Sequence, residues 1–385
     1  MLKTGETKGT TDMKFTCEKS ALANAISIAS RTVAMKSTIP ALEGLLIEAR
    51  GMETIISGYN LKTGIRTALD AVVTEPGSIV LNAKLFGDIV RKMPDDTVSF
   101  DTDDGYMVKL CCGMSSFDIM GTSADDYPDL PSVDTLEKIN IEEGVLKELI
   151  GETLFAVSTN EARPIHTGSL FEIENGLLTV VSVDGFRLAL RREEIKCDNE
   201  EKISFVVPGS ALSEVEKIAS ESEEQATICL GDKHIMFIIG STELVSRRLE
   251  GEFLDYNKSI PASGKMNLTV NRRELSGIIE RISLLISEKY KSPVRCKFTD
   301  GSLRVSTATA LGKAIDECEI VGDGQGLEIG FNNRYLLDAL KAAPSDDLRL
   351  QLSSPIAPCV ILPADEEDNS FVYLILPVRI RAEEE

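Results

Sequence analysis

The chain has 385 residues, of which 43% are hydrophobic, and its formal net charge is −21 at pH 7. The length predicts two or three domains, and the composition is that of a folded protein rather than of a disordered one. No apolar run reaches the ~20 residues of a membrane helix, so we expect a cytoplasmic protein without a membrane partner. The acidic charge excludes a uniformly basic protein that coats nucleic acid. A nucleic-acid-binding protein whose positive charge is confined to one surface stays compatible with this composition.

The first segment, 1–12, is polar and is expected to be a disordered leader. From Met13 onward the sequence repeats itself. The segments KFTCEKSAL from Lys14, KINIEEGVL from Lys138 and MNLTVNRREL from Met266 each predict a short strand that runs into a helix. The distance between them gives a period of about 125 residues, which is typical of a repeated structural unit.

After each of these helices, two alternating apolar segments flank a turn. The turns are Arg50-Gly51, Asn175-Gly176 and Asp300-Gly301, which predict three antiparallel hairpins. A second strand and helix follow in every repeat, as in SIVLNAKLFGDIVRKM, ISFVVPGSALSEVEKI and LEIGFNNRYLLDALKA. Each repeat therefore predicts two helices on antiparallel sheets, an α+β fold.

Two polar segments that contain proline separate the repeats. They are 127–137 (YPDLPSVDTLE) and 256–264 (YNKSIPASG), and both are expected to be linkers. The predicted domains are 13–135, 136–262 and 263–385.

Positive charge recurs on the predicted helices. Counted from Ala83, Pro208 and Asn332 as equivalent positions, the tenth residue is a lysine in every repeat. These lysines are Lys92, Lys217 and Lys341. Other basic residues on or beside the helices are Arg31, Lys84, Arg91, Lys147, Arg272, Arg273, Arg281 and Arg334. Such residues are ordinary on exposed helices, but around a hole they would hold phosphates without reading sequence.

The sequence shows no catalytic pattern. Of its two histidines, neither lies near a second ligand in sequence, and the eight cysteines have no metal or disulfide spacing. We expect buried, reduced thiols, no metal, no cofactor and no enzymatic activity. Asp101–Gly105 and Gly322–Gly326 are expected to be turns. Two alternatives stay open: a carboxylate-metal nuclease and an interaction scaffold that never encircles DNA.

Local motifs carry a resemblance to one family across 13–381. MKFTCEKSAL, AKLFGDIVRKMP and DDYPDLP lie in the first repeat, and RPIHTGSLFE, SVDGFRLAL and GEFLDYNKSIP lie in the second. GFNNRYLLDAL and YLILPVRI lie in the third. In this order and spacing, the chain resembles the bacterial DNA polymerase III beta subunit, the DNA sliding clamp.

The resemblance implies a non-enzymatic processivity factor: a head-to-tail homodimeric ring of three repeated clamp domains per chain, which encircles double-stranded DNA. The basic residues named above would then face the DNA. The dimer interface implied by the family is Phe117, Ile119, Leu285 and Ile286. The implied partners are the polymerase III alpha subunit, the clamp loader and other proteins that carry a clamp-binding motif.

The family also has a hydrophobic cleft that receives short partner peptides. Carried over to this sequence, the cleft is His166, Val183, Gly185, Phe186, Arg187, Leu188, Leu254, Lys258, Ser259, Asn332, Tyr335, Ile356, Pro358, Leu376, Pro377, Val378 and Arg379.

Overall fold

The computed structural model describes residues 12–196, 201–287 and 289–380. The predicted leader 1–12 lies outside them except for Asp12. The chain forms two compact units: unit 1 is 1–144 with 217–248, and unit 2 is 145–216 with 249–385. Each unit is described by itself. None of the described helices has both the length and the apolar character needed to cross a bilayer.

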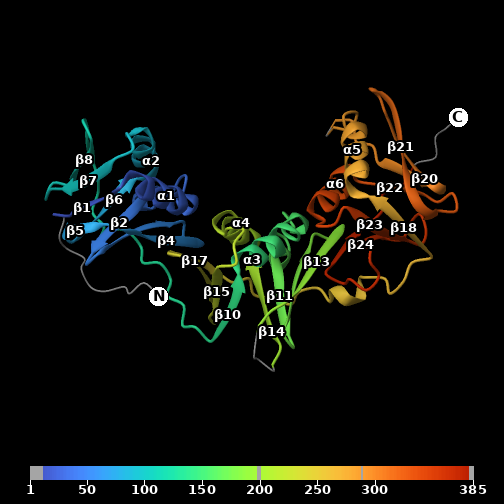
Figure 1. Cartoon of the computed structure of the whole chain (residues 1–385), viewed down its shortest axis with the longest axis horizontal. Helices are drawn as coiled ribbons and strands as arrows, with labels where there is room; N and C mark the ends of the chain where they lie inside the picture. The colour runs from blue at the N-terminus through green and yellow to red at the C-terminus, as the bar shows by residue number, and fades with distance from the viewer. Residues whose placement is uncertain (1–11, 197–200, 288, 381–385) are drawn as a thin grey trace. The chain divides into compact units, whose positions relative to one another are not determined.

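Unit 1 contains helices α1 (Lys19–Ala29) and α2 (Ala83–Lys92) and two antiparallel sheets (Figure 1). In spatial order, the five-stranded sheet is β5 (Val72–Glu75), β1 (Lys14–Glu18), β7 (Thr97–Thr102), β8 (Met107–Cys112) and β9 (Ser115–Met120). The eight-stranded sheet is β10 (Glu137–Glu142), β15 (Gln225–Leu230), β16 (His234–Ile239), β17 (Thr242–Arg247), β4 (Thr63–Asp70), β3 (Glu53–Tyr59), β2 (Gly44–Arg50) and β6 (Gly77–Asn82).

Unit 2 contains one twelve-stranded antiparallel sheet with α5 (Arg272–Ser283) and α6 (Asn333–Ala342). Helices α3 (Glu143–Gly151) and α4 (Gly209–Ile218) lie mainly in this unit. In spatial order, the strands are β14 (Ile203–Pro208), β11 (Gly168–Glu174), β12 (Leu177–Val183), β13 (Arg187–Glu194), β25 (Phe371–Ile375), β24 (Cys359–Pro363), β23 (Asp347–Leu352), β18 (Met266–Asn271), β21 (Gly312–Asp323), β20 (Asp300–Thr309), β19 (Val294–Phe298) and β22 (Glu328–Phe331).

The predicted hairpins are confirmed, since β2–β3, β11–β12 and β19–β20 are antiparallel pairs. At the second turn, Asn175 and Gly176 have φ of 54° and 76°, the left-handed backbone that a two-residue turn requires. The alternating apolar residues face the cores. In unit 1, for example, the rings of Phe15 and Phe100 stack with centroids 4.7 Å apart, and both side chains are fully buried.

The helix caps correct the predicted alignment of the repeats. Asn82 Oδ1 accepts a hydrogen bond from Leu85 N at 3.0 Å, and Asn332 Oδ1 accepts one from Tyr335 N at 3.4 Å. Asn82, not Ala83, therefore corresponds to Asn332. The basic residue eight positions after the first residue of the helix is Arg91 in α2, Lys217 in α4 and Lys341 in α6. The prediction that placed Lys92 in this set is wrong by one residue.

The segments expected to be linkers are packed. Tyr127, Leu130 and Val133 are 3%, 9% and 4% exposed and belong to a hydrophobic cluster with Leu42. In the second segment, Tyr256 is buried, and its hydroxyl donates to Glu172 Oε2 at 2.6 Å. The polar, proline-bearing composition predicted loose linkers, but the apolar residues spaced along each segment hold it on its unit. The predicted domain boundaries themselves stay a prediction.

Sheet pairing joins one repeat to the next. Strand β4 of the first repeat pairs with β17 of the second, and β13 of the second pairs with β25 of the third. In both cases the strand that follows the hairpin β2–β3 or β11–β12 takes the last strand of the following repeat as its neighbour. The same chain therefore contains two examples of one edge-to-edge joint, which the sequence alone did not indicate.

Cysteines are buried as predicted wherever the structure describes them, except for the half-buried Cys111. The buried set is Cys17, Cys112, Cys229, Cys296, Cys318 and Cys359, all with free thiols. Burial raises the pKa of the Cys17, Cys318 and Cys359 thiols to about 12. Since the thiolate is the reactive form, these residues act as small apolar core residues.

Candidate functional site

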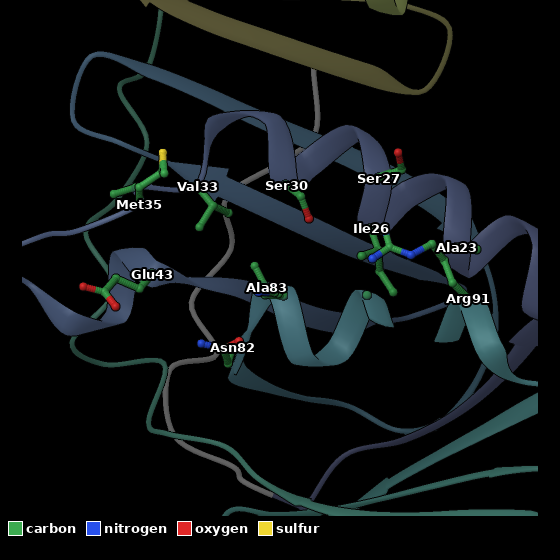
Figure 2. Close-up of a pocket in the computed structure, with 13 residues that line it drawn as sticks. Ala23, Ile26, Ser27, Ser30, Val33, Met35, Glu43, Asn82, Ala83 and Arg91 are labelled. Atoms are coloured by element: carbon green, nitrogen blue, oxygen red, sulfur yellow. The ribbon is translucent and has the colours of Figure 1, made fainter. Parts of the chain in front are cut away.

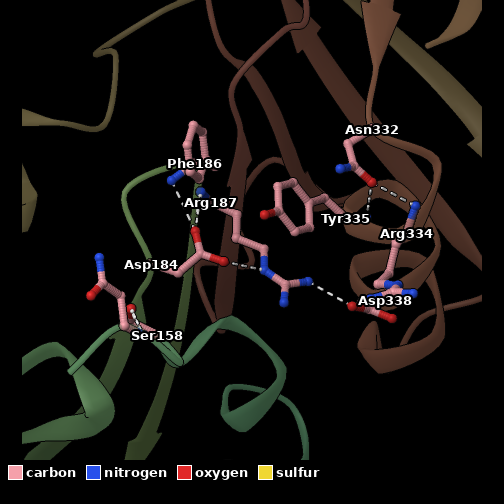
Figure 3. A network of polar contacts seen from close by, with 9 residues as sticks. Ser158, Asp184, Phe186, Arg187, Asn332, Arg334, Tyr335 and Asp338 are labelled. Carbon is pink, nitrogen blue, oxygen red and sulfur yellow. Dashed lines mark hydrogen bonds and ion pairs between the residues drawn. The ribbon is translucent and has the colours of Figure 1, made fainter. Parts of the chain in front are cut away.

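The turn between β12 and β13 in unit 2 brings an aromatic ring and a guanidinium to one place (Figure 3). Asp184 Oδ1 accepts hydrogen bonds from Phe186 N at 2.9 Å and Arg187 N at 3.0 Å, which fixes the turn. Gly185, between them, has a φ of 89°, which favours glycine. The local sequence Asp-Gly-Phe-Arg thus determines how the Phe186 and Arg187 side chains leave the strand.

Arg187 is held by two carboxylates. Its Nε donates to Asp184 Oδ2 at 2.9 Å, and its Nη1 donates to Asp338 Oδ2 at 2.6 Å. The guanidinium carbon lies 4.5 Å from the centre of the Tyr335 ring and 5.4 Å from that of Phe155. The arginine side chain is only 10% exposed, so the ion pairs and ring contacts offset the cost of removing its charge from water.

Tyr335 forms the other side of this cluster. Its ring stacks on that of Phe186 with centroids 6.1 Å apart, and its backbone N–H is capped by Asn332 at the start of α6. Both Asn332 and Tyr335 also line a pocket of about 480 Å³ together with Val378. This combination of an aromatic wall, an apolar side chain and a few polar groups suits a short peptide with apolar anchors.

The terminal segment after β25 is fixed from both sides. Leu376 N donates to Phe186 O and Val378 N donates to Gly330 O, each at 2.8 Å. The side chains of Leu376 and Val378 stay 37% and 40% exposed. Two predicted cleft residues therefore present apolar surface beside the aromatic cluster.

Other predicted cleft residues have different places. Val183 and Leu188 are almost fully buried in a hydrophobic cluster with Tyr256, Val360 and Leu374, so they can form only the floor. Exposed or half-exposed at the surface are Gly185, Leu254, Lys258, Ser259, Ile356, Pro358, Pro377 and Arg379.

His166 packs edge-on against Phe253, with ring centroids 5.4 Å apart. Burial and the nearby Arg163 lower the pKa of His166, which favours the neutral imidazole at pH 7. Lys258 is 85% exposed and pairs with Asp255 at 2.8 Å. These contacts explain how both side chains are placed, and neither joins them to the Arg187 cluster.

Sequence reasoning missed Asp184, Asp338 and Phe155. The first two had a signal, since Asp184 opens the Asp-Gly turn and Asp338 lies three residues after Tyr335 on one helix face. Phe155 had none, because it reaches Arg187 only through the tertiary fold.

Many of the predicted DNA-facing side chains are paired with carboxylates of the same chain. Arg272 and Arg273 donate to Asp346 at 3.1 and 3.0 Å, and this pairing holds the pKa of Asp346 below its usual range. Further pairs are Arg281 with Asp316, Lys341 with Glu280, and Arg91 with Asp88. Lys84, Lys92 and Arg334 are exposed. The helices therefore present interleaved charge rather than a basic stripe.

A second pocket, of about 520 Å³, lies against α1 and α2 in unit 1 (Figure 2). Lys84 and Arg91 line it, together with Ser27 and Ser30. Met35, also on its lining, is 96% exposed. Two of the predicted DNA-facing residues thus share one hollow of the helix face.

The predicted interface residues lie on incompletely covered elements. Phe117 and Ile119 are on β9, a strand with no fully buried residue although it belongs to a sheet. Leu285 is half-buried, and Ile286 packs against the core of unit 2. Leu284, just before them, is 82% exposed and was not among the predicted residues.

The fold and the site define the class of the protein. Repeats of two helices on antiparallel sheets, joined edge to edge, are the architecture of a DNA clamp. Within the described ranges, no group of three or more His, Cys, Asp or Glu side chains is placed to hold a metal.

Comparisons with known proteins identify the family. Its models match in chain order: the N-terminal domain of the DNA polymerase III beta subunit over 13–131, the central domain over 140–255 and the C-terminal domain over 257–379. The beta sliding clamps of Staphylococcus epidermidis and Staphylococcus aureus are 31% and 30% identical over 377 residues. Each alignment covers 95% of this chain and 99% of the relative.

Solved structures agree. A DNA polymerase III beta subunit from Eubacterium rectale is 36% identical and a sliding clamp from Bacillus subtilis 32%, both with a TM-score of 0.89. Both matches cover 96% of this chain and 100% of the solved chain. The chain belongs to the bacterial DNA polymerase III beta subunit family, the beta sliding clamps, whose role in replication is processivity and not catalysis. The predicted family, fold class and function are confirmed.

Proposed function

We propose that two copies of this chain close head to tail around duplex DNA. The ring then tethers the polymerase III alpha subunit, the clamp loader and other motif-bearing proteins through the cleft around Phe186, Arg187, Tyr335 and Val378. The pair of edge-to-edge joints within the chain carries this proposal, because it leaves a third such joint for a second copy to complete. The proposed domains are 13–135, 136–262 and 263–385, and the proposed location is the cytoplasm, where bacterial DNA is copied.

The repeated joint supports the dimer. In the first and second repeats, the strand that follows the predicted hairpin (β4 or β13) is covered by the last strand of the next repeat. In the third repeat the corresponding strand is β21, and residues 312–319 have a described partner strand on one side only. The last strand of the first repeat is β9, which pairs only with β8 within the described residues. The free edges of β21 and β9 are therefore complementary halves of one joint, supplied by two copies.

Strand register gives the alignment of this joint. Ile65 lies opposite Leu244 in the first joint, and Ala189 lies opposite Tyr373 in the second. The strand registers show which residues occupy the same position in each repeat. Ala314 occupies the position of Ile65 and Ala189. Phe117 occupies the position of Leu244 and Tyr373. Ala314 of one copy is thus expected opposite Phe117 of the other.

Exposure supports this register. Leu244 and Tyr373, inside their joints, are 1% and 0% exposed, whereas Phe117 is 39% exposed. One residue along the ladder, Lys313 falls opposite Asp118, and both are exposed. Opposite charges across an antiparallel pair stabilise it, and a match of this kind also selects one register.

The charge arrangement supports sequence-independent DNA contact. Arg91, Lys217 and Lys341 occupy one position in three equivalent helices, so a ring would repeat the same contact to phosphate. At least Arg91 and Lys341 are also paired with carboxylates. Such pairs weaken each phosphate contact, which favours sliding over tight binding. The acidic remainder repels DNA from other surfaces.

Replacing Tyr335 by alanine is expected to weaken binding of a polymerase-derived peptide by about tenfold or more, because the aromatic wall of the cleft is lost. Val378→Ala is expected to have a smaller effect of the same sign. Fluorescence anisotropy with a labelled peptide measures both. Parent-like affinity in the Tyr335 variant would show that the cleft is placed wrongly, provided that the dimer is intact by sedimentation.

Topological retention tests the ring. The protein is loaded onto nicked circular DNA by a clamp loader, and the DNA is then linearised. A ring is retained on the circle and lost from the free ends after cutting. Equal retention on both forms would mean direct binding to DNA and would contradict encirclement, and metal-dependent cleavage of the DNA would support a nuclease instead.

A further inference from the structure

An ion-pair bridge through Arg187 joins the two sides of the proposed cleft. Arg187 and Asp184 lie within the match to the central family domain, and Asp338 lies within the match to the C-terminal one. The Arg187 guanidinium binds both carboxylates, at 2.9 and 2.6 Å. The two aspartates are not interchangeable. Asp184 also accepts two backbone N–H groups of its own turn, whereas Asp338 binds the Nη1 end of the guanidinium.

The bridge sets where the guanidinium lies. Asp184 engages Nε, near the strand, and Asp338 engages Nη1, at the far end of the side chain. Asp338 and Tyr335 are three residues apart on α6 and therefore share a helix face (Figure 3). Anchoring Nη1 to Asp338 draws the guanidinium over the Tyr335 ring, where its carbon lies 4.5 Å from the ring centre.

We propose that Asp338 is a positioning residue for peptide capture. By holding Arg187 against Tyr335, it fixes the Phe186–Tyr335 wall before a peptide arrives, without contacting the peptide itself. A preformed wall lowers the ordering cost of binding, since two rotamer-rich side chains are already immobilised. The inference rests on the proposed cleft and adds to it a residue that lies behind the binding surface.

Loss of the Asp338 charge has a defined consequence. The guanidinium still binds Asp184 through Nε, but its Nη1 is no longer bound to α6. Tyr335 then loses its cationic neighbour and can change rotamer independently of Phe186. A peptide must reorder both side chains, and its affinity falls although every group in direct contact with it is still present.

The test compares labelled-peptide binding to the full-length protein and to variants at this position. Asp338→Asn is expected to weaken a peptide with a phenylalanine anchor about tenfold, and Asp338→Glu, which keeps the charge, to recover most of the loss. Glu366→Gln is the matched control, because Glu366 binds Arg349 at 3.2 Å in the same unit. This control is expected to bind the peptide as the parent does.

A second readout separates positioning from general stability. A peptide with alanine in place of the phenylalanine anchor is expected to lose little affinity on Asp338→Asn, because it does not use the aromatic wall. The two changes are therefore coupled in a double-mutant cycle. Thermal unfolding of the variant is expected to stay near that of the parent. Equal losses for both peptides would mean a structural role and would overturn the inference.

The remaining outcomes are also decisive. If Asp338→Asn strengthens binding of the peptide, Asp338 acts by repelling it, and positioning is wrong. If Tyr335→Ala weakens binding while Asp338→Asn leaves it unchanged, the cleft stands and only the role of Asp338 fails. If the parent binds neither peptide, the failure lies with the proposed function.

Discussion

Phe117→Glu is expected to convert the dimer into a monomer. In the proposed joint, Phe117 occupies the position of Leu244 and Tyr373, which are buried when their joints are formed. A carboxylate there would be buried without a partner, which costs several kcal/mol and raises the dimer dissociation constant by a factor of roughly a thousand. Sedimentation equilibrium measures the change. Because β9 contributes no fully buried residue to its own unit, the monomer is expected to stay folded by circular dichroism.

A charge swap tests the register of the same joint. Asp118→Lys places like charges opposite each other with Lys313, and Lys313→Asp does the same with Asp118, so each single variant is expected to weaken the dimer. Combining them restores opposite charges and is expected to restore association. Recovery in the double variant is specific to this pairing. A double variant as weak as the two single ones would place these residues apart, and an unchanged dimer mass in Phe117→Glu would remove β9 from the interface.

Reversing Arg91, Lys217 and Lys341 to glutamate is expected to abolish retention of loaded protein on closed circular DNA. The three positions are equivalent, so a ring of two chains loses the same phosphate contact at six places and gains repulsion there. Gel filtration of the loading reaction measures the retained fraction. The salt dependence of DNA binding is expected to become shallower for milder alanine variants at the same sites, because fewer counterions are released.

The control has the same change in net charge. Lys233, Lys265 and Lys297 are exposed and lie outside the six helices of the described residues. Their reversal to glutamate is expected to leave retention near the parent level. Equal loss in both triple variants would mean that total charge, rather than the helix positions, governs DNA contact. Normal retention in the helix variant would exclude these positions from the DNA-facing surface.

The repeat, the hairpins and the class of fold could all be predicted from the amino-acid sequence. These features depend on local signals, such as the Asn175-Gly176 turn, the alternation of apolar residues along strands and the asparagine caps, Asn82 and Asn332, before two of the second helices. Such signals are read over a few residues and need no knowledge of distant contacts. The family resemblance added the prediction of a cleft. Among the residues predicted for it, Tyr335 contacts both Phe186 and Arg187 and lines one pocket with Val378.

The alignment of the three repeats, predicted by counting residues, was wrong by one residue in the first repeat. Lys92 was aligned with Lys217 and Lys341, but the caps at Asn82 and Asn332 shift the first repeat and make Arg91 their equivalent. A strand or helix start is fixed by hydrogen bonds, which a pattern locates only to within a residue or two. The prediction that 127–137 is a loose linker was wrong for another reason. The segment is polar on average, but three of its side chains are apolar and pack against partners that are distant in sequence.

Which side chains act together depends on contacts between elements that are distant in sequence. Arg187 and Asp338 are 151 residues apart in sequence, and no periodicity links a strand in one repeat to a helix face in the next. The same holds for the sheet joints, because a strand edge is free or covered according to which distant strand reaches it. Local sequence determines the elements, through backbone and periodicity. Packing and the pairing of buried charges bring distant elements into contact. These contacts determine which side chains form the site.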